Sequence, residues 1–300
     1  MRTGSGAVVA GGTAVTLALA GCVIDVEGYE AEESEAHVFV VGGVPDVDLS
    51  TFEGRIEVRG WDRSEVRVVV EKRAASRERL EEIEIETVQS GDRVRVAARR
   101  DDTAGLRVSF SRRGNRQSAR LIASVPHESN LVARTDDSRI TVVGITGTIE
   151  VAADDGRIQG ERLRGFVRAR TDDGSVRLLD VDGGVVAHAD DGSITVSGVL
   201  TGLEASTDDG RIAIEAAPGS AMRGDWDVDA DDGRVTLDLP RDFSAELDLA
   251  VDNGRIRVDD HFGGGADRGD ETLRRSIGAG GFELRVRTDD GSIRIGTSGG

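Results

Sequence analysis

Apolar and polar residues alternate in short paired runs through the middle of the chain. Counted from the first Asp of a recurring corner motif, positions five and seven are mostly aliphatic, and so are positions fourteen and sixteen. In the unit that begins at Asp190 these positions hold Ile194 and Val196, then Leu203 and Ala205. A period of two is typical of a β-strand with one buried face, whereas a helix needs steps of three and four. The pattern therefore predicts two short strands in each unit.

The units recur at a fixed period. Five of them begin 18 residues apart, at Asp136, Asp154, Asp172, Asp190 and Asp208. Later copies begin at looser intervals, at Asp231, Asp252 and Asp289. A fixed short period indicates a stack in which each unit covers the apolar face of its neighbour. The sequence predicts an all-β fold, a single-chain β-solenoid of the β-helix or β-roll kind, with 18-residue rungs.

Two corners are expected to close each rung. One is the Asp-Asp-Gly motif, and the other carries a glycine near position twelve, as at Gly147, Gly165, Gly183 and Gly219. Glycine reaches positive φ without a Cβ clash, and Asp can bond to backbone amides nearby. We interpret the Asp pairs as structural caps of the corner amides. Their charge is expected to be offset by arginines at position four: Arg139, Arg157, Arg211, Arg234 and Arg255.

The flanking segments are less regular. Residues 36–132 are β-rich and are predicted to form a first layer and irregular cap, because the end of a solenoid has an open sheet edge to cover. This segment contains one expected helical stretch, at 76–82. The solenoid repeats occupy 133–300 and are interrupted by a Gly-rich stretch, 261–281, which we expect to be a surface loop. The final copy, at Asp289, is expected to close the stack.

The N-terminus carries a targeting pattern. An apolar stretch follows Arg2 and is too short to span a bilayer. It ends in Leu-Ala-Gly-Cys, which resembles the bacterial lipoprotein signal, cleaved before a cysteine that then receives lipid. Cys22 is the only cysteine, which excludes an internal disulfide. We expect a lipoprotein signal peptide at 1–21 and an acidic tether at 22–35, with lipid on Cys22 as the membrane partner.

Charge narrows the choice of partners. The chain has 38 basic and 56 acidic residues, a formal net charge of −18, and no basic stripe is visible along the sequence. Such a chain is a poor ligand for nucleic acid. No nucleic-acid partner and no cofactor are therefore expected.

A calcium-binding β-roll is one alternative. Corner carboxylates stacked about 4.8 Å apart would form an acidic ladder, and carboxylate oxygens suit calcium. The residues concerned are Asp154, Asp155, Asp172, Asp173, Asp190, Asp191, Asp208 and Asp209. The second corner lacks the Asp that a calcium β-roll repeats there. We therefore favour a structural role for the corners and predict no metal site.

A carbohydrate-active β-helix enzyme is the other alternative. It would use exposed carboxylates from neighbouring rungs beside an aromatic sugar platform, for which Trp226 is the candidate. The chain is only 3% aromatic, and no nucleophile motif of the Gly-x-Ser-x-Gly type occurs. Its four histidines, at 37, 127, 188 and 261, have no metal-ligand spacing. We expect no catalytic residues.

Several of these features together resemble one protein family. They are the lipoprotein-like start, Gly-Arg-Ile-Glu-Val at 54–58, Gly-Trp-Asp at 60–62, the short helix and the repeated Thr-Asp-Asp-Gly-Ser-Ile units. Over 36–296 the chain resembles a bacterial family of candidate adhesins with β-strand repeats, a domain of unknown function. The resemblance implies a solenoid fold and an extracytoplasmic, envelope location. Because Asp directly after a lipidated cysteine often retains lipoproteins at the inner membrane, Val23 favours the outer membrane or cell surface in a Gram-negative organism. The expected function is a non-catalytic adhesin-like, binding or structural module with an envelope protein or glycan as partner.

Overall fold

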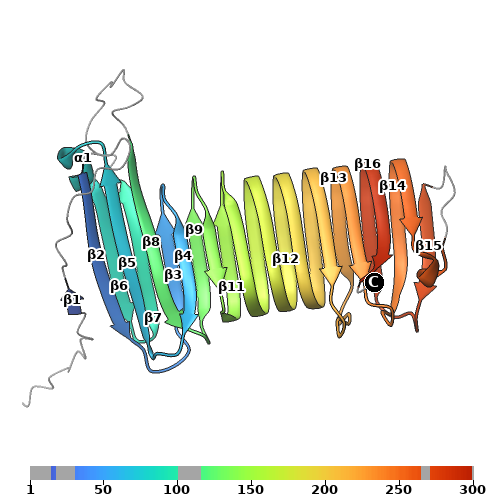
Figure 1. The fold of residues 1–300 in the computed structure, drawn as a ribbon, viewed down its shortest axis with the longest axis horizontal. Coiled ribbons are helices and arrows are strands. Elements are labelled where there is room, and N and C mark those ends of the chain that lie inside the picture. Colours follow the sequence, from blue (N-terminus) through green and yellow to red (C-terminus); the bar gives the residue numbers. More distant parts are fainter. Residues whose placement is uncertain (1–14, 18–30, 101–115, 265–270, 299–300) are drawn as a thin grey trace, which may run out of the picture.

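The fold was analysed in a computed structural model that describes residues 15–17, 31–100, 116–264 and 271–298. Its elements are β1 (Val15–Leu17), β2 (Ala31–Val40), β3 (Asp46–Thr51), β4 (Ile56–Trp61), β5 (Glu65–Ala74), α1 (Arg77–Glu81), β6 (Ile83–Ser90), β7 (Arg93–Arg100), β8 (Gln117–Pro126), β9 (Asn130–Thr135), β10 (Ile140–Val143), β11 (Thr146–Ala153), β12 (Arg157–Ala216), β13 (Trp226–Leu239), β14 (Ala245–Val258), the 3-10 turn η1 (Asp260–Phe262), β15 (Thr272–Ile277) and β16 (Glu283–Thr297). The all-β prediction is confirmed. Figure 1 shows an elongated, solenoid-like stack.

One continuous sheet wraps around the core as two walls. Its strands follow the order β1-β2-β5-β8-β4-β10-β12-β11-β9-β3-β7-β6. The 60-residue β12 winds as a coil, so that it pairs with β10 on one side and with β11 on the other. We call the side with β8, β4 and β10 wall A, and the side with β7, β3, β9 and β11 wall B. Each turn of β12 then adds one stretch to each wall.

The strands stack in register with their inward residues aligned. Ile140 of wall A pairs in parallel with Ile158, and Ile149 of wall B pairs with Val167, so partners here are 18 residues apart. In the unit that begins at Asp190, the four residues at the predicted inward positions have exposed fractions of 4% or less: Ile194, Val196, Leu203 and Ala205. The alternation therefore reports the buried face correctly, and aliphatic side chains from both walls fill the space between them.

The Asp-Asp-Gly corners stack more closely than a side chain allows. A Cβ at Gly174 would collide with the carbonyl oxygen of Gly156, and one at Gly192 would collide with that of Gly174. Neither Gly174 nor Gly192 has positive φ. At these two positions the space between successive rungs therefore requires glycine. The expected positive φ is found at Gly233 and Gly291 of the same corner motif, and at the second corner in Gly147, Gly165, Gly183 and Gly219.

Buried threonines, and not the aspartates, satisfy the corner backbone. The Thr171 hydroxyl donates to the carbonyl oxygens of Asp154 and Gly156, each 3.2 Å away. Two repeats later, the Thr207 hydroxyl makes the equivalent contacts with the carbonyl oxygens of Asp190 and Gly192. Among the described residues, no Asp of the Asp-Asp-Gly corners accepts a hydrogen bond from a backbone amide. The expected amide caps are thus wrong, because the carboxylates point away from the sheet while the threonines face inward.

At the N-terminal end the spatial order of strands departs from their order in the sequence. β4 lies between β8 and β10, and β3 lies between β7 and β9. The rung formed by β3 and β4 is therefore inserted between rungs made of later residues, and its strands appear blue between green ones in Figure 1.

The C-terminal end contains a second insertion. β16 pairs in parallel with both β13 and β14, so the last repeat lies between the two preceding ones instead of closing the stack. The loop expected over 261–281 also needs correction, because the end of η1 and the whole of β15 lie in it. β15 pairs antiparallel with the outer side of β14 and covers that part of its edge.

The N-terminal cap combines antiparallel strands with the expected helix. Ser76 caps α1 by accepting a bond from the Arg79 amide, and Leu80 packs into a small apolar cluster at this end of the core. β2 begins at Ala31, inside the predicted tether, and pairs with β5 over its full length. The tether prediction therefore extends too far by the residues from Ala31 onward.

Candidate functional site

Position four of each rung places a line of arginines on the outer face of wall A. Arg139 precedes Ile140, whose strand pairs with that of Ile56, and Arg211 pairs with Arg234. Along the stack this line reads Arg55, Arg139, Arg157, Ser175, Ser193, Arg211, Arg234, Ser292 and Arg255. We call it the arginine row. Parallel pairing in register brings these residues from distant parts of the sequence onto adjacent strands.

The arginine row is not neutralised by ion pairs. Among the described residues, no carboxylate lies within 4.0 Å of its guanidinium groups. Other arginines of the stack do pair across strands, such as Arg120 with Glu57 at 2.7 Å on wall A and Arg285 with Asp227 at 3.0 Å on wall B. The expectation that these arginines offset the corner charge therefore has no ion pair to support it among the described residues.

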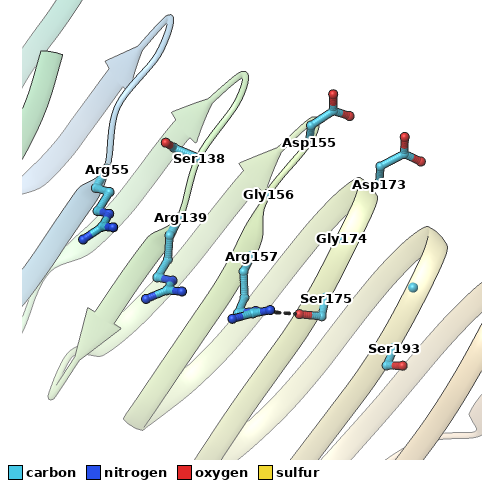
Figure 2. Close-up of a pocket in the computed structure, with 11 residues that line it drawn as sticks. Arg55, Ser138, Arg139, Asp155, Gly156, Arg157, Asp173, Gly174, Ser175 and Ser193 are labelled. Carbon is cyan, nitrogen blue, oxygen red and sulfur yellow. Dashed lines mark hydrogen bonds between the residues drawn. The ribbon is translucent and has the colours of Figure 1, made fainter. Parts of the chain in front are cut away.

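A hollow of about 660 Å³ lies over the first part of the row. Figure 2 shows Arg55, Arg139 and Arg157 extending in the same direction from neighbouring strands, away from the corner carboxylates of Asp155 and Asp173. Arg157 Nε donates to Ser175 Oγ at 3.1 Å, while Arg139 Nε is buried and has no partner among the described residues. The hollow is thus lined by three guanidinium groups, one of which keeps a buried N–H without a partner among the described residues.

The predicted corner aspartates gather along one edge beside this wall. The eight are Asp154, Asp155, Asp172, Asp173, Asp190, Asp191, Asp208 and Asp209. Burial of the carboxylate and the neighbouring charges, Asp173 first among them, raise the pKa of Asp155. Burial and Asp154 likewise raise the pKa of Asp136. The edge is therefore an array of like charges in mutual repulsion.

Positive charge close to the corner aspartates comes from a position that the sequence analysis did not single out, two residues before the corner. Arg170 supplies this charge, at 3.3 Å from Asp172 and 3.6 Å from Asp190. The ring nitrogen Nε2 of His188 is a further polar neighbour of Asp190, at 2.7 Å. The part of the chain that the structure describes contains no group of three or more His, Cys, Asp or Glu side chains arranged to hold a metal ion.

The other sequence-predicted groups do not converge. Cys22 lies outside the described residues. Trp226 is fully buried against Phe243, with ring centroids 5.2 Å apart, and offers no sugar platform. His127 bonds to the Gly144 carbonyl and His261 to the Arg241 carbonyl, at separate places in the fold.

The arginine row is the feature that the sequence analysis missed. Its signal is present, because arginine recurs at position four of the aligned units. From the sequence alone this recurrence indicates local charge compensation, and no basic stripe is visible. The stripe becomes visible only when β3, β4 and β16 are placed in their true neighbourhoods, since this adds Arg55 to one end and a second line of arginines to the other.

The sequence model of the Toastrack DUF4097 family matches residues 46–296. None of the curated proteins matches the chain. The described residues contain no helix that is long and apolar enough to cross a membrane.

Three solved structures resemble the fold at low identity. A candidate cell adhesion protein of Clostridium sporogenes is 12% identical, with 89% of this chain and 100% of that one covered and a TM-score of 0.27. A candidate adhesin of Bacteroides fragilis is 10% identical, with 90% and 100% covered and a TM-score of 0.43. A candidate lipid-binding protein of Parabacteroides distasonis is 13% identical, with 89% and 98% covered and a TM-score of 0.46.

Proposed function

The chain belongs to the Toastrack DUF4097 family, and we propose that it is a lipid-anchored, extracytoplasmic module of the cell envelope that binds a partner without catalysis. In this proposal a coil of 18-residue rungs acts as a rigid spacer and presents wall A to the partner. The lipid at Cys22 tethers the stack through a short acidic segment that ends at β2.

The arginine row is the observation that supports binding. A chain with a net charge of −18 keeps an arginine-rich line on wall A without carboxylate partners in the described residues, although other arginines on both walls pair with carboxylates across strands. A regular, extended surface of one charge is suited to recognition, because complementary potentials direct encounter and orientation. No comparable observation supports catalysis, because Trp226 is buried in the core and therefore provides no aromatic surface for a sugar beside the corner carboxylates.

Fractionation of cells tests the anchor. Cys22→Ser should move the protein from the membrane fraction to the soluble extracytoplasmic fraction, and labelled fatty acid should be incorporated only into the wild type. Ser34→Ala, an exposed change in β2, serves as the control and should leave both results unchanged. Equal incorporation of label into the Cys22→Ser protein would exclude lipidation at this residue.

Sedimentation with isolated envelopes tests binding. The soluble Cys22→Ser protein lacks the anchor, so any sedimentation with envelope fragments must come from the folded stack. We expect saturable binding that weakens as salt rises, because charges on a surface are screened over about 10 Å at 0.1 M salt. Absence of binding at low salt would contradict the proposed function.

A further inference from the structure

The C-terminal insertion of β16 assembles a second line of arginines beside the row. Three adjacent strands of wall A each expose two outward residues here: Arg234 and Thr236 on β13, Ser292 and Arg294 on β16, and Arg255 and Arg257 on β14. We call these six residues the donor grid. They line a shallow depression of about 290 Å³.

Every residue of the grid offers hydrogen-bond donors, and none of its side chains is a carboxylate. The four arginines are exposed, and none of them has an ion pair or a side-chain hydrogen bond among the described residues. Guanidinium groups bind carboxylate, sulfate and phosphate through two parallel bonds, and the hydroxyls of Thr236 and Ser292 add further donors between them.

Protection of a sheet edge does not account for this cluster. The second half of β14 pairs only with β16 among the described strands, so Arg255 and Arg257 could serve to keep this edge from pairing with another chain. Arg234 and Arg294 lie on strands that are paired on both sides. Their exposed charges need another explanation, and binding of an anion supplies one.

The surroundings of the grid define the shape of its ligand. Corner aspartates border it on one side, where burial and the neighbouring charges, Asp290 first among them, raise the pKa of Asp232. On the other side Asp238 lies beside Gly296. The basic surface is therefore a narrow strip that runs across the strands, about 4.8 Å per strand. An extended anionic chain fits such a strip, whereas a broad anionic membrane surface would also face the flanking aspartates.

From this arrangement we infer that the donor grid is the binding site for an acidic polysaccharide, with its carboxylate or sulfate groups on the four arginines. This inference rests on the proposed function, and it names the ligand class and the place of binding. The remainder of the arginine row would extend the contact for longer chains.

Titration of the soluble full-length chain with defined probes tests the site. Heparin oligosaccharides present sulfate and carboxylate, polygalacturonate presents carboxylate alone, and neutral dextran is the uncharged control. We expect at least one acidic polysaccharide to bind and dextran not to bind. The variant with Arg234, Arg255, Arg257 and Arg294 changed to Gln should lose at least about tenfold in affinity, equivalent to about 1.4 kcal/mol.

A matched variant separates the site from net charge. Arg162, Arg164, Arg168 and Arg170 are four exposed arginines of the central coil that lie outside wall A. Their change to Gln alters the net charge by the same amount and should leave affinity within about twofold, well below the tenfold step. Equal loss in both variants would overturn the inference. If the grid variant does not fold, as judged by circular dichroism, Arg294→Gln alone should still weaken binding measurably, and no weakening would count against the site.

Other anions test the assignment of the ligand. Vesicles with phosphatidylglycerol and a polyglutamate peptide are expected to bind more weakly than the best polysaccharide, and tighter binding of either would overturn the choice of a glycan. Sedimentation with envelopes distinguishes failure of the donor grid as a binding site from failure of the proposed envelope-binding function. Undiminished sedimentation of the grid variant would refute the site while the proposed function stands. Binding of polysaccharide without binding of envelopes would refute the function while the site stands.

Discussion

The central coil and the two ends of the stack solve the same structural problem in different ways. In β12 each turn pairs with the turns before and after it in the sequence, and glycine corners and inward aliphatic residues repeat at each step. At both ends a strand or rung is inserted between neighbours that are remote from it in sequence. Local repetition sets the register in the coil, whereas long-range pairing sets it at the ends.

Charge follows this division only in part. Burial and neighbouring like charges raise the pKa of corner aspartates both in the coil, at Asp155, and at the C-terminal end, at Asp232, but the C-terminal insertion also brings opposite charges together on a half-buried part of the sheet. There Asp248 accepts bonds from Arg287 of β16 and Arg274 of β15. Opposite charges on adjacent strands favour one register over others. The C-terminal insertion therefore relies on specific charge partners in addition to shape.

Burying a charge in the coil should have the largest effect. Ile194 is fully buried, so Ile194→Asp should lower the free energy of unfolding by more than about 4 kcal/mol and destabilise neighbouring rungs with it. Thr195→Asp, one residue further and pointing outward, should be nearly silent in thermal melting. Similar melting temperatures for the two variants would show that the register of the coil is wrong.

Filling the glycine corner should come next. Gly192→Ala places a Cβ against the carbonyl oxygen of Gly174, which forces successive rungs apart. We expect a loss of about 1–3 kcal/mol, as for overpacking in cores. Gly202→Ala is the control in the same strand, because its Cβ would meet only the Gly184 Cα at 3.9 Å. Chemical denaturation measures both, and a tolerated Gly192→Ala would contradict the close stacking of corners.

Breaking the charge contacts of the C-terminal insertion should have a moderate effect. Burial of Asp248 is outweighed by its bonds to Arg287 and Arg274, which lower its pKa below the ordinary 3.8. A lowered folded pKa stabilises the fold above that value, and this contribution is lost as pH falls through the folded pKa. Asp248→Asn should cost about 1–2 kcal/mol at pH 7.

The pH dependence and a control variant sharpen this test. The difference in unfolding free energy between Asp248→Asn and the wild type should shrink as pH falls below 3.8. Asp242→Asn, an exposed change before β14, should have no comparable effect at any pH. A loss in Asp248→Asn that is constant with pH would show that packing, and not the charge, is responsible.

The sequence predicts the coil well and the order of strands at the two ends poorly. Ile194 and Val196 are correctly placed inward because their alternation is a local property of the strand. The insertions of β4 and β16 could not be foreseen, since every repeat has a similar apolar pattern and any copy could pair with any other. The donor grid depends on that order, because Arg294 meets Arg234 and Arg257 only through the insertion of β16.

Removing charge from the corners should have the smallest effect on stability, and it should stabilise the fold where the preceding changes destabilise it. A raised folded pKa means that the folded state disfavours the charged carboxylate, so stability falls as pH rises from 3.8 through the folded pKa. Asp155→Asn with Asp173→Asn should therefore raise the melting temperature slightly at pH 7 and low salt, with the gain disappearing below pH 3.8. Asp190→Asn should not, because it loses its contacts with Arg170 and His188.

Calcium distinguishes repulsion at the corners from a metal-binding ladder. If the corners only repel, calcium should raise the melting temperature no more than magnesium at the same ionic strength, since screening acts with any mobile ion. Specific sites would instead stabilise by about 2.7 kcal/mol at a hundredfold excess over Kd. The Asn variants would then melt below the wild type in calcium. That reversal, seen with calcium and not with magnesium, would replace like-charge repulsion with metal binding as the account of the acidic edge.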